Sequence, residues 1–97
     1  MKLRFTPRAA SDLVDIAEFI RRESPHGALR VRASILQSLE RLVAFPRMGR
    51  RQRTAGVRKF VARRYGYVIY YSIDVVADEL IVVSIRHPAQ GRLAADR

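Results

Sequence analysis

The sequence offers one candidate for acid–base catalysis, a histidine that could act together with basic side chains. His87 is the only histidine at the end of a predicted strand, and an imidazole can act as a general acid near neutral pH, for example in RNA cleavage. Attack by a 2′-hydroxyl would also need a base and a cation that stabilises the phosphate. The basic side chains available for such a site are Arg58, Lys59, Arg63 and Arg86. Because no base is paired with His87, local hydrogen bonding is the favoured interpretation of this residue.

The net charge is large and unevenly distributed. The 97 residues include 19 Lys and Arg against 9 Asp and Glu, a formal charge of +10, and residues 46–73 hold eight basic side chains and no acidic one. A block of one sign repels itself and favours an anionic partner, either nucleic acid or an acidic protein segment. The alternative is a solvated surface in an arginine-rich protein, because 17 of the 19 basic residues are arginines.

Several function classes are disfavoured by what the chain lacks. It has no cysteine and only two histidines, so a disulfide framework is excluded and we expect no metal and no cofactor. The first residues contain no apolar run of signal-peptide length, and no apolar stretch approaches the roughly 20 residues that span a bilayer. We therefore expect a cytoplasmic protein with no membrane partner.

The first half of the chain is predicted to be a short strand followed by a helical hairpin. Residues 2–5 alternate apolar and basic side chains, as a strand does. Thr6-Pro7 and Ser24-Pro25 each combine an N-cap residue with proline at the first helical position, so a helix is predicted to begin at each. Apolar residues at spacings of three and four give each helix one apolar face, and Pro46 ends the second helix.

The second half is predicted to be a loop and three strands. Residues 46–56 are rich in glycine and arginine and form the loop, whereas residues 57–63, 65–73 and 80–86 have the composition of strands. Residues 89–97 are predicted to be a loose tail. The order β-α-α-β-β-β predicts one two-layer α+β domain over residues 1–97, with an antiparallel sheet packed under an αα-hairpin and the first strand beside the last.

Most of the other polar and aromatic side chains are predicted to have structural roles. Tyr67 and Tyr71 alternate with core positions and are predicted to pack, whereas Tyr65 and Tyr70 could also stack on bases. Arg58 and Arg63 are predicted to be held on a strand, where a guanidinium can fork onto a carboxylate. The loop arginines are predicted to be solvated: Arg50, Arg51 and Arg53. The acidic residues of the first helix are predicted to balance arginines, and the earliest ones also suit the helix dipole: Asp12, Asp15, Glu18 and Glu23.

In this order and spacing, a set of short motifs resembles the ParE/RelE superfamily of type II toxins. The resemblance covers roughly residues 5–88 of the chain. The motifs are Ala10 with Asp12-Leu13 and Ile16, Phe45-Pro46 with Gly49-Arg50, Gly56-Val57-Arg58, Tyr67-Val68-Ile69-Tyr70-Tyr71, and Val82-Val83-Ser84-Ile85-Arg86-His87. The resemblance implies a toxin that is blocked by an antitoxin whose C-terminal segment wraps around it.

One position favours the ParE-like branch of this superfamily. RelE-like members cut messenger RNA inside the ribosome and usually carry an arginine directly after a Gly-Tyr-like pair, near the scissile phosphate. Here the pair is Gly66-Tyr67 and the next residue is Val68, whose apolar side chain cannot stabilise charge on a phosphate. RelE-like members also carry a basic residue near the end of the last strand, where this chain has His87-Pro88. Many ParE members follow this histidine with a charged pair, and the segment from Pro88 to Arg92 departs from that pattern.

The resemblance therefore implies a ParE-like toxin that inhibits DNA gyrase by protein contact and is held by an acidic antitoxin in a hetero-oligomer. Such a toxin is not an enzyme, and no catalytic residue is favoured. The alternative is a ribosome-dependent mRNA endonuclease that uses His87 with Arg58, Lys59 or Arg63, and a second alternative is a basic nucleic-acid-binding module. Arg58 is expected to be either structural or an antitoxin contact. The residues expected to contact the antitoxin or the target are Arg58, Arg63, Arg86, His87 and Arg92.

Overall fold

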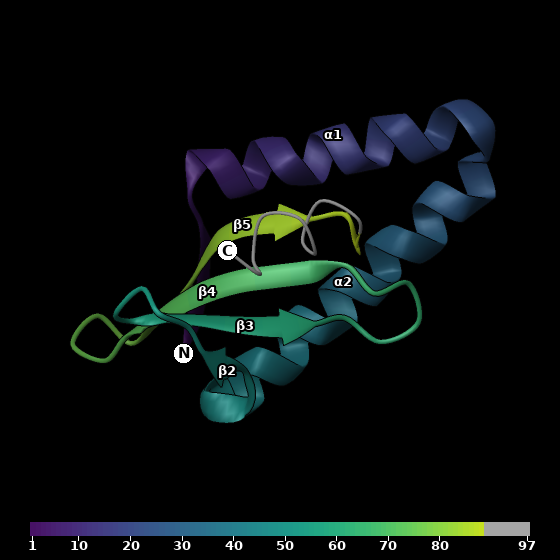
Figure 1. Ribbon diagram of the computed structural model, residues 1–97. Coiled ribbons are helices and arrows are strands. Elements are labelled where there is room, and N and C mark those ends of the chain that lie inside the picture. Colours follow the sequence, from purple (N-terminus) through teal and green to yellow (C-terminus); the bar gives the residue numbers. More distant parts are fainter. Residues whose placement is uncertain (89–97) are drawn as a thin grey trace.

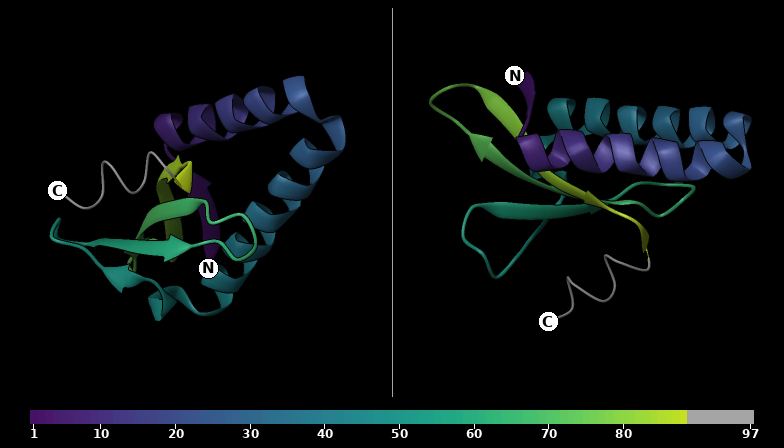
Figure 2. Two further views of the ribbon diagram at one scale, coloured as in Figure 1. Left: turned by 45° about the vertical axis from the view of Figure 1, so that its right-hand side comes forward. Right: turned by 90° about the horizontal axis from the view of Figure 1, so that it is seen from above.

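The computed structural model describes residues 1–88 as a sheet with two helices on one of its faces (Figures 1 and 2). The predicted loose tail, residues 89–97, lies outside the described residues, and Arg92 lies outside them with it. Neither helix has a stretch that is long and apolar enough to cross a bilayer. In chain order the elements are β1 (Lys2–Phe5), α1 (Pro7–Glu23), α2 (Pro25–Ala44), the 3-10 helix η1 (Pro46–Met48), β2 (Arg50–Arg51), β3 (Val57–Val61), β4 (Val68–Asp74) and β5 (Glu79–Arg86).

The helical hairpin begins and turns where the two capping sequences predict. Thr6 Oγ1 accepts a hydrogen bond from the amide of Ala9 at 3.1 Å, and Ser24 Oγ accepts one from the amide of Gly27 at 3.0 Å. The amide of Ser24 also donates to the carbonyl of Ile20 at 2.8 Å. Ser24 thus ends one helix and begins the next, and the predicted helical hairpin is confirmed.

The sheet has the strand order β1-β5-β4-β3-β2. Strands β3, β4 and β5 form the predicted antiparallel meander, and β1 lies beside β5 as predicted. However, β1 runs parallel to β5, so the sheet is mixed rather than antiparallel throughout. Parallel neighbours need a long crossover connection, and the helical hairpin together with the rest of the meander supplies it. The predicted α+β class is confirmed.

Two segments of the second half differ from the sequence prediction. The strand predicted to begin at Tyr65 begins at Val68, because Arg64 and Gly66 adopt left-handed conformations, with φ of 64° and 72°, and form a turn. The segment predicted to be wholly loop contains η1 and the two-residue strand β2, which pairs with β3. Arginine rarely adopts a left-handed conformation, so its presence at position 64 does not predict a turn. The turn could therefore not be located from the composition of the segment.

The core lies between the sheet and the inner faces of the two helices. Tyr67 is buried beside the sheet, and Tyr65 packs against the core from its edge. The packing predicted for Tyr67 and Tyr71 is therefore confirmed. The largest fully buried side chains come from α2, β4 and β5: Tyr71, Ile35, Leu39, Leu42, Ile69, Leu80 and Val82.

Residues of α1 and its N-cap form hydrogen bonds with the backbone of β5 along the edge that β1 only partly covers. Strand β1 pairs with only the first four residues of β5. Where this pairing ends, Thr6 donates to the carbonyls of Val82 and Val83, from its amide at 3.0 Å and from Oγ1 at 2.9 Å. Asp12 Oδ2 then accepts a hydrogen bond from the amide of Ile85 at 3.0 Å. Asp12 therefore satisfies a sheet amide, a role that its position on a helix flank did not indicate.

Replacing Asp12 by alanine is expected to destabilise the protein by about 1–3 kcal/mol, because the amide of Ile85 loses its acceptor in a partly buried place. The measurement is urea unfolding of both proteins. Asp15→Ala is the control, since it removes the same charge from an exposed position of the same helix and is expected to change stability by no more than about 0.5 kcal/mol. Equal losses in the two variants would contradict this role of Asp12.

Candidate functional site

Tyr71 and Arg58 hold the segment between α2 and β2 against the sheet. The Tyr71 hydroxyl accepts a hydrogen bond from the amide of Gly49 at 2.9 Å and donates one to the carbonyl of Pro46 at 2.6 Å. Arg58 stands opposite Tyr71 in the β3–β4 register. Its Nη1 donates to the carbonyls of Gly49 and Arg47 at 2.8 and 3.2 Å. Two neighbouring side chains on the sheet thus fix the backbone of this segment, and Arg58 has a structural role.

Close approach to the sheet explains the glycine at position 49. A Cβ atom built on Gly49 would lie 2.5 Å from the hydroxyl oxygen of Tyr71 and 2.7 Å from its Cε1. Gly49 has an extended backbone with φ of −73°, which any residue can adopt. Lack of space, rather than backbone conformation, therefore requires a glycine, and part of the Phe45-Pro46 and Gly49-Arg50 motif has a structural reason.

Burial raises the pKa of the Tyr71 hydroxyl above the usual value for tyrosine. The hydrogen bond from the Gly49 amide and the positive charge of Arg58 act in the opposite direction and are smaller effects. Burial also raises the pKa of Tyr67. Tyr71 consequently keeps its proton at neutral pH and can donate it to the carbonyl of Pro46.

The four residues of the nuclease hypothesis do not form one cluster. Arg58 is engaged with backbone carbonyls, and Lys59, the next residue in the strand, projects from the opposite face of the sheet. Arg63 is exposed in the turn after β3, so the prediction that it is held on a strand is wrong: the strand ends at Val61. His87 follows β5, which is separated from β3 by β4.

His87 lies against Tyr67 and near α1. The two rings meet edge to face, with centroids 5.5 Å apart and planes at 89°, a favourable aromatic geometry. Together with Asp15, Ile16 and Phe19 they line a hollow of about 370 Å³. The part of the chain that the structure describes has no group of three His, Cys, Asp or Glu side chains that could hold a metal ion. His87 is thus an exposed side chain whose described contact is with Tyr67, beside α1.

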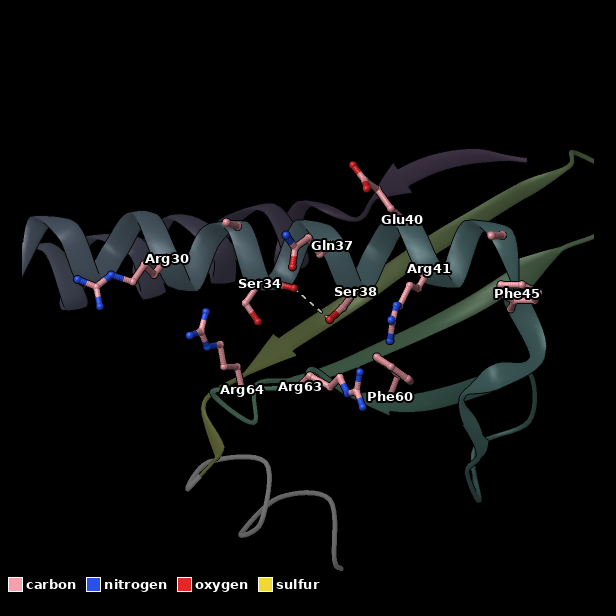
Figure 3. Close-up of a pocket in the computed structure, with 12 residues that line it drawn as sticks. Arg30, Ser34, Gln37, Ser38, Glu40, Arg41, Phe45, Phe60, Arg63 and Arg64 are labelled. Carbon is pink, nitrogen blue, oxygen red and sulfur yellow. Dashed lines mark hydrogen bonds between the residues drawn. The ribbon is translucent and has the colours of Figure 1, made fainter.

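A larger hollow of about 840 Å³ lies between α2 and the turn that follows β3 (Figure 3), and we call it the α2 groove. Arg30 and Arg41 reach it from α2, and Arg63 and Arg64 reach it from the turn. Sequence reasoning concentrated on residues 46–73 and missed the two helical arginines. Their spacing of eleven residues is about three helical turns and places them on one face, which is the signal that could have found them. The groove is further lined by Ala33, Ser34, Gln37, Ser38, Glu40, Ala44, Phe45 and Phe60.

Comparison with known proteins identifies the family. The family described as "ParE toxin of type II toxin-antitoxin system, parDE" matches residues 3–91. The chain belongs to this ParE toxin family. A curated relative from Sinorhizobium fredii, named "Putative toxin Y4kP", is 32% identical over 82 residues, which cover 84% of this chain and 85% of the relative.

Solved structures share the fold of this ParE-family chain. A chain of the chromosomal ParDE system from P. aeruginosa matches with a TM-score of 0.75 and 26% identity, over 90% of this chain and 95% of that one. A chain of the intact E. coli RelBE toxin–antitoxin complex matches with a TM-score of 0.69 over 89% and 94% of the two chains. Its 18% identity shows the fold alone. The resemblance to the ParE/RelE superfamily of type II toxins is thus confirmed.

Replacing Tyr71 by phenylalanine is expected to lower the free energy of unfolding by about 1–3 kcal/mol, because the amide of Gly49 and the carbonyl of Pro46 both lose a partner. Chemical denaturation measures the change. The control is Tyr65→Phe, which removes a hydroxyl that has no hydrogen bond among residues 1–88 and is expected to have little effect. If both variants lose the same stability, the two hydrogen bonds of Tyr71 do not hold the segment.

The stabilisation by Tyr71 is also expected to depend on pH. Because its pKa is raised in the folded protein, this contribution is complete below the pKa of an unfolded tyrosine, about 10, and is lost as pH rises through that value toward the folded pKa. The stability difference between the wild type and Tyr71→Phe should be constant from about pH 7 to 9 and shrink above about pH 10. Unfolding curves over this range provide the test, since Tyr67 is common to both proteins and cancels. A difference that grows above pH 10 would show that the sign is wrong.

Proposed function

We propose that this toxin inhibits DNA gyrase by protein contact, as the ParE-like branch does, and that an acidic antitoxin neutralises it. The observation that supports gyrase inhibition, rather than RNA cleavage, is the burial of Val68. Its side chain is 5% exposed and stands between Val61 and Arg86 in the sheet register. This position follows the Gly66-Tyr67 pair, where RelE-like nucleases usually carry an arginine, and a buried valine cannot stabilise a phosphate.

The surroundings of the remaining candidates also support a role other than cleavage. Arg58 donates to two backbone carbonyls, so using it on a phosphate would release the segment that it holds. His87 is exposed and rests on Tyr67 beside α1, and β4 lies between β5, which it follows, and β3, which carries Arg58 and Lys59. General acid catalysis requires the acid and the cation to reach the same substrate atoms, and Arg58 is already bonded to the backbone of its own fold.

Two observations support an antitoxin partner. The matching solved structures are described as a ParDE system and as RelBE toxin–antitoxin complexes. The formal charge of +10 complements an acidic protein, and complementary charge favours rapid and selective association. The partner of this chain is therefore expected to be acidic in the segment that contacts it.

The test is a gyrase assay with purified toxin that has been freed from its antitoxin. We expect loss of supercoiling of relaxed plasmid, or trapped cleaved DNA, at toxin concentrations close to that of gyrase. Adding the antitoxin should restore supercoiling. Unchanged supercoiling at a large excess of folded toxin would overturn the gyrase proposal for the tested enzyme.

The variant His87→Ala distinguishes the two activities of the superfamily. Under the gyrase proposal it is expected to inhibit supercoiling within about threefold of the wild type, because inhibition by contact needs no general acid and truncation of most single interface residues costs little. Messenger RNA in a translating extract should remain intact with either protein. Cleavage by the wild type that disappears in His87→Ala, while circular dichroism shows an intact fold, would instead establish the endonuclease.

A further inference from the structure

A hollow beside α1 differs from two larger hollows in the charge of its lining. It has a volume of about 370 Å³ and no lysine or arginine among its described lining residues, and we call it the α1 hollow: Asp15, Ile16, Phe19, Tyr67 and His87. The α2 groove is lined by four arginines, and a hollow beside β2 is lined by Arg50, Arg51 and Lys59. On a chain with a formal charge of +10, most of the surface repels a cation. The α1 hollow is a place where a cation can approach.

Asp15 supplies a negative charge at this hollow. The carboxylate of Asp12, one turn earlier on α1, is already bonded to the amide of Ile85. Asp15 is exposed and forms no hydrogen bond or ion pair with any of residues 1–88. A carboxylate can accept two parallel hydrogen bonds from one guanidinium. The hollow therefore contains an acceptor that the described fold of the toxin does not use.

Apolar surface lies directly beside this carboxylate. Phe19 is four residues after Asp15 on α1, so the two side chains are neighbours on one side of the helix, and Phe19 is 63% exposed. Ile16 extends the apolar surface. Tyr67 and His87, in edge-to-face contact, line the hollow from positions next to β4 and β5. A ligand that combines a cation with an apolar stem would use both the charge and the apolar surface.

An arginine side chain has this combination. Its methylene stem can lie on Ile16 and Phe19 while its charged end stays at the rim, and its planar guanidinium both stacks on an aromatic ring and pairs with a carboxylate. A lysine ammonium is more strongly hydrated and lacks the planar fork. His87 is a wall of the hollow rather than an anchor, because its truncation leaves Asp15 and Phe19 in place. This agrees with the small effect expected for His87→Ala.

The charge of the hollow favours the target over the antitoxin as the partner. The antitoxin is proposed to be acidic, and Asp15 would repel a carboxylate at this place. A nucleic acid is disfavoured for the same reason, because its phosphates would meet a carboxylate and no described lysine or arginine. A second copy of this chain is disfavoured by its own charge of +10.

We propose that the α1 hollow binds an arginine side chain of DNA gyrase, an inference that rests on the proposed function. The guanidinium donates two parallel hydrogen bonds to the carboxylate of Asp15. The methylene stem covers Phe19 and Ile16 and removes their exposed surface from water. A single side chain anchored in a pocket of this kind can supply a large share of the binding energy of an interface.

The first test compares two double variants that remove the same charge and a similar apolar surface. Asp15→Asn/Phe19→Ala alters the hollow, whereas Glu23→Gln/Leu29→Ala alters exposed positions outside it, with Leu29 64% exposed. We expect the hollow variant to need about thirtyfold more protein than the wild type for half-inhibition of supercoiling, and the control to change by less than about threefold. The affinity for the purified cognate antitoxin should stay within about threefold in both variants. Circular dichroism should show the same fold for all three proteins.

The second test examines the hollow without gyrase. N-acetyl-arginine amide is titrated onto isotope-labelled toxin, and N-acetyl-citrulline amide, its uncharged analogue of the same shape, is the control ligand. We expect the arginine compound to shift the nuclear magnetic resonances of Asp15, Ile16 and Phe19 with a Kd on the order of millimolar. The citrulline compound should shift them at least about tenfold less at the same concentration, because it cannot pair with the carboxylate as a cation.

Three results would overturn the assignment of the hollow. One is inhibition of gyrase by the hollow variant that equals inhibition by the control variant. Another is loss of antitoxin affinity in the hollow variant alone, which would assign the hollow to the antitoxin. The last is an equal response, or no response, to the arginine and citrulline compounds. If the wild type fails to inhibit gyrase but binds the arginine compound at the hollow, the arginine site is supported and only gyrase is removed as its partner.

Discussion

The hydroxyl of Tyr71 connects the segment that follows α2 to the sheet. This side chain is fully buried in β4, and its oxygen joins the carbonyl of Pro46, just beyond the end of α2, to the amide of Gly49. Arg58 adds its bonds to the same segment from the neighbouring strand. The α2 groove lies between α2 and the turn that follows β3, so these hydrogen bonds connect the end of one of its walls to the sheet.

Local signals in the sequence were sufficient for the helices, whereas non-local ones decided the details of the sheet. Thr6 and Ser24 form caps with residues three positions away, so both helix starts could be predicted. The parallel pairing of β1 with β5 joins residues more than seventy positions apart, and no local pattern specifies its direction. The start of β4 depends on a left-handed Arg64, a conformation that costs energy in most residues other than glycine and that is therefore set by its surroundings.

Charge density alone was a poor guide to the site. The basic block of residues 46–73 contains arginines with different roles. Arg58 donates a hydrogen bond to a backbone carbonyl, whereas Arg63 lines the α2 groove. Arg30 and Arg41 belong to no dense block, and they become part of the same surface only because α2 packs beside the turn that follows β3. The family resemblance identified the class of protein from motifs that are largely structural, such as the glycine that Tyr71 requires at position 49.

These arginines also act on the stability of the chain in two opposite ways. Arg58 stabilises the free chain, because its hydrogen bonds are made within the fold. The four arginines of the groove add repulsion to a protein that already has a charge of +10, and a high net charge destabilises a compact state. An anionic ligand at these arginines would relieve that repulsion, and any ligand that binds only the folded state raises its stability by mass action. The same side chains that lower the stability of the free chain would then raise the stability of a form bound to an anionic ligand.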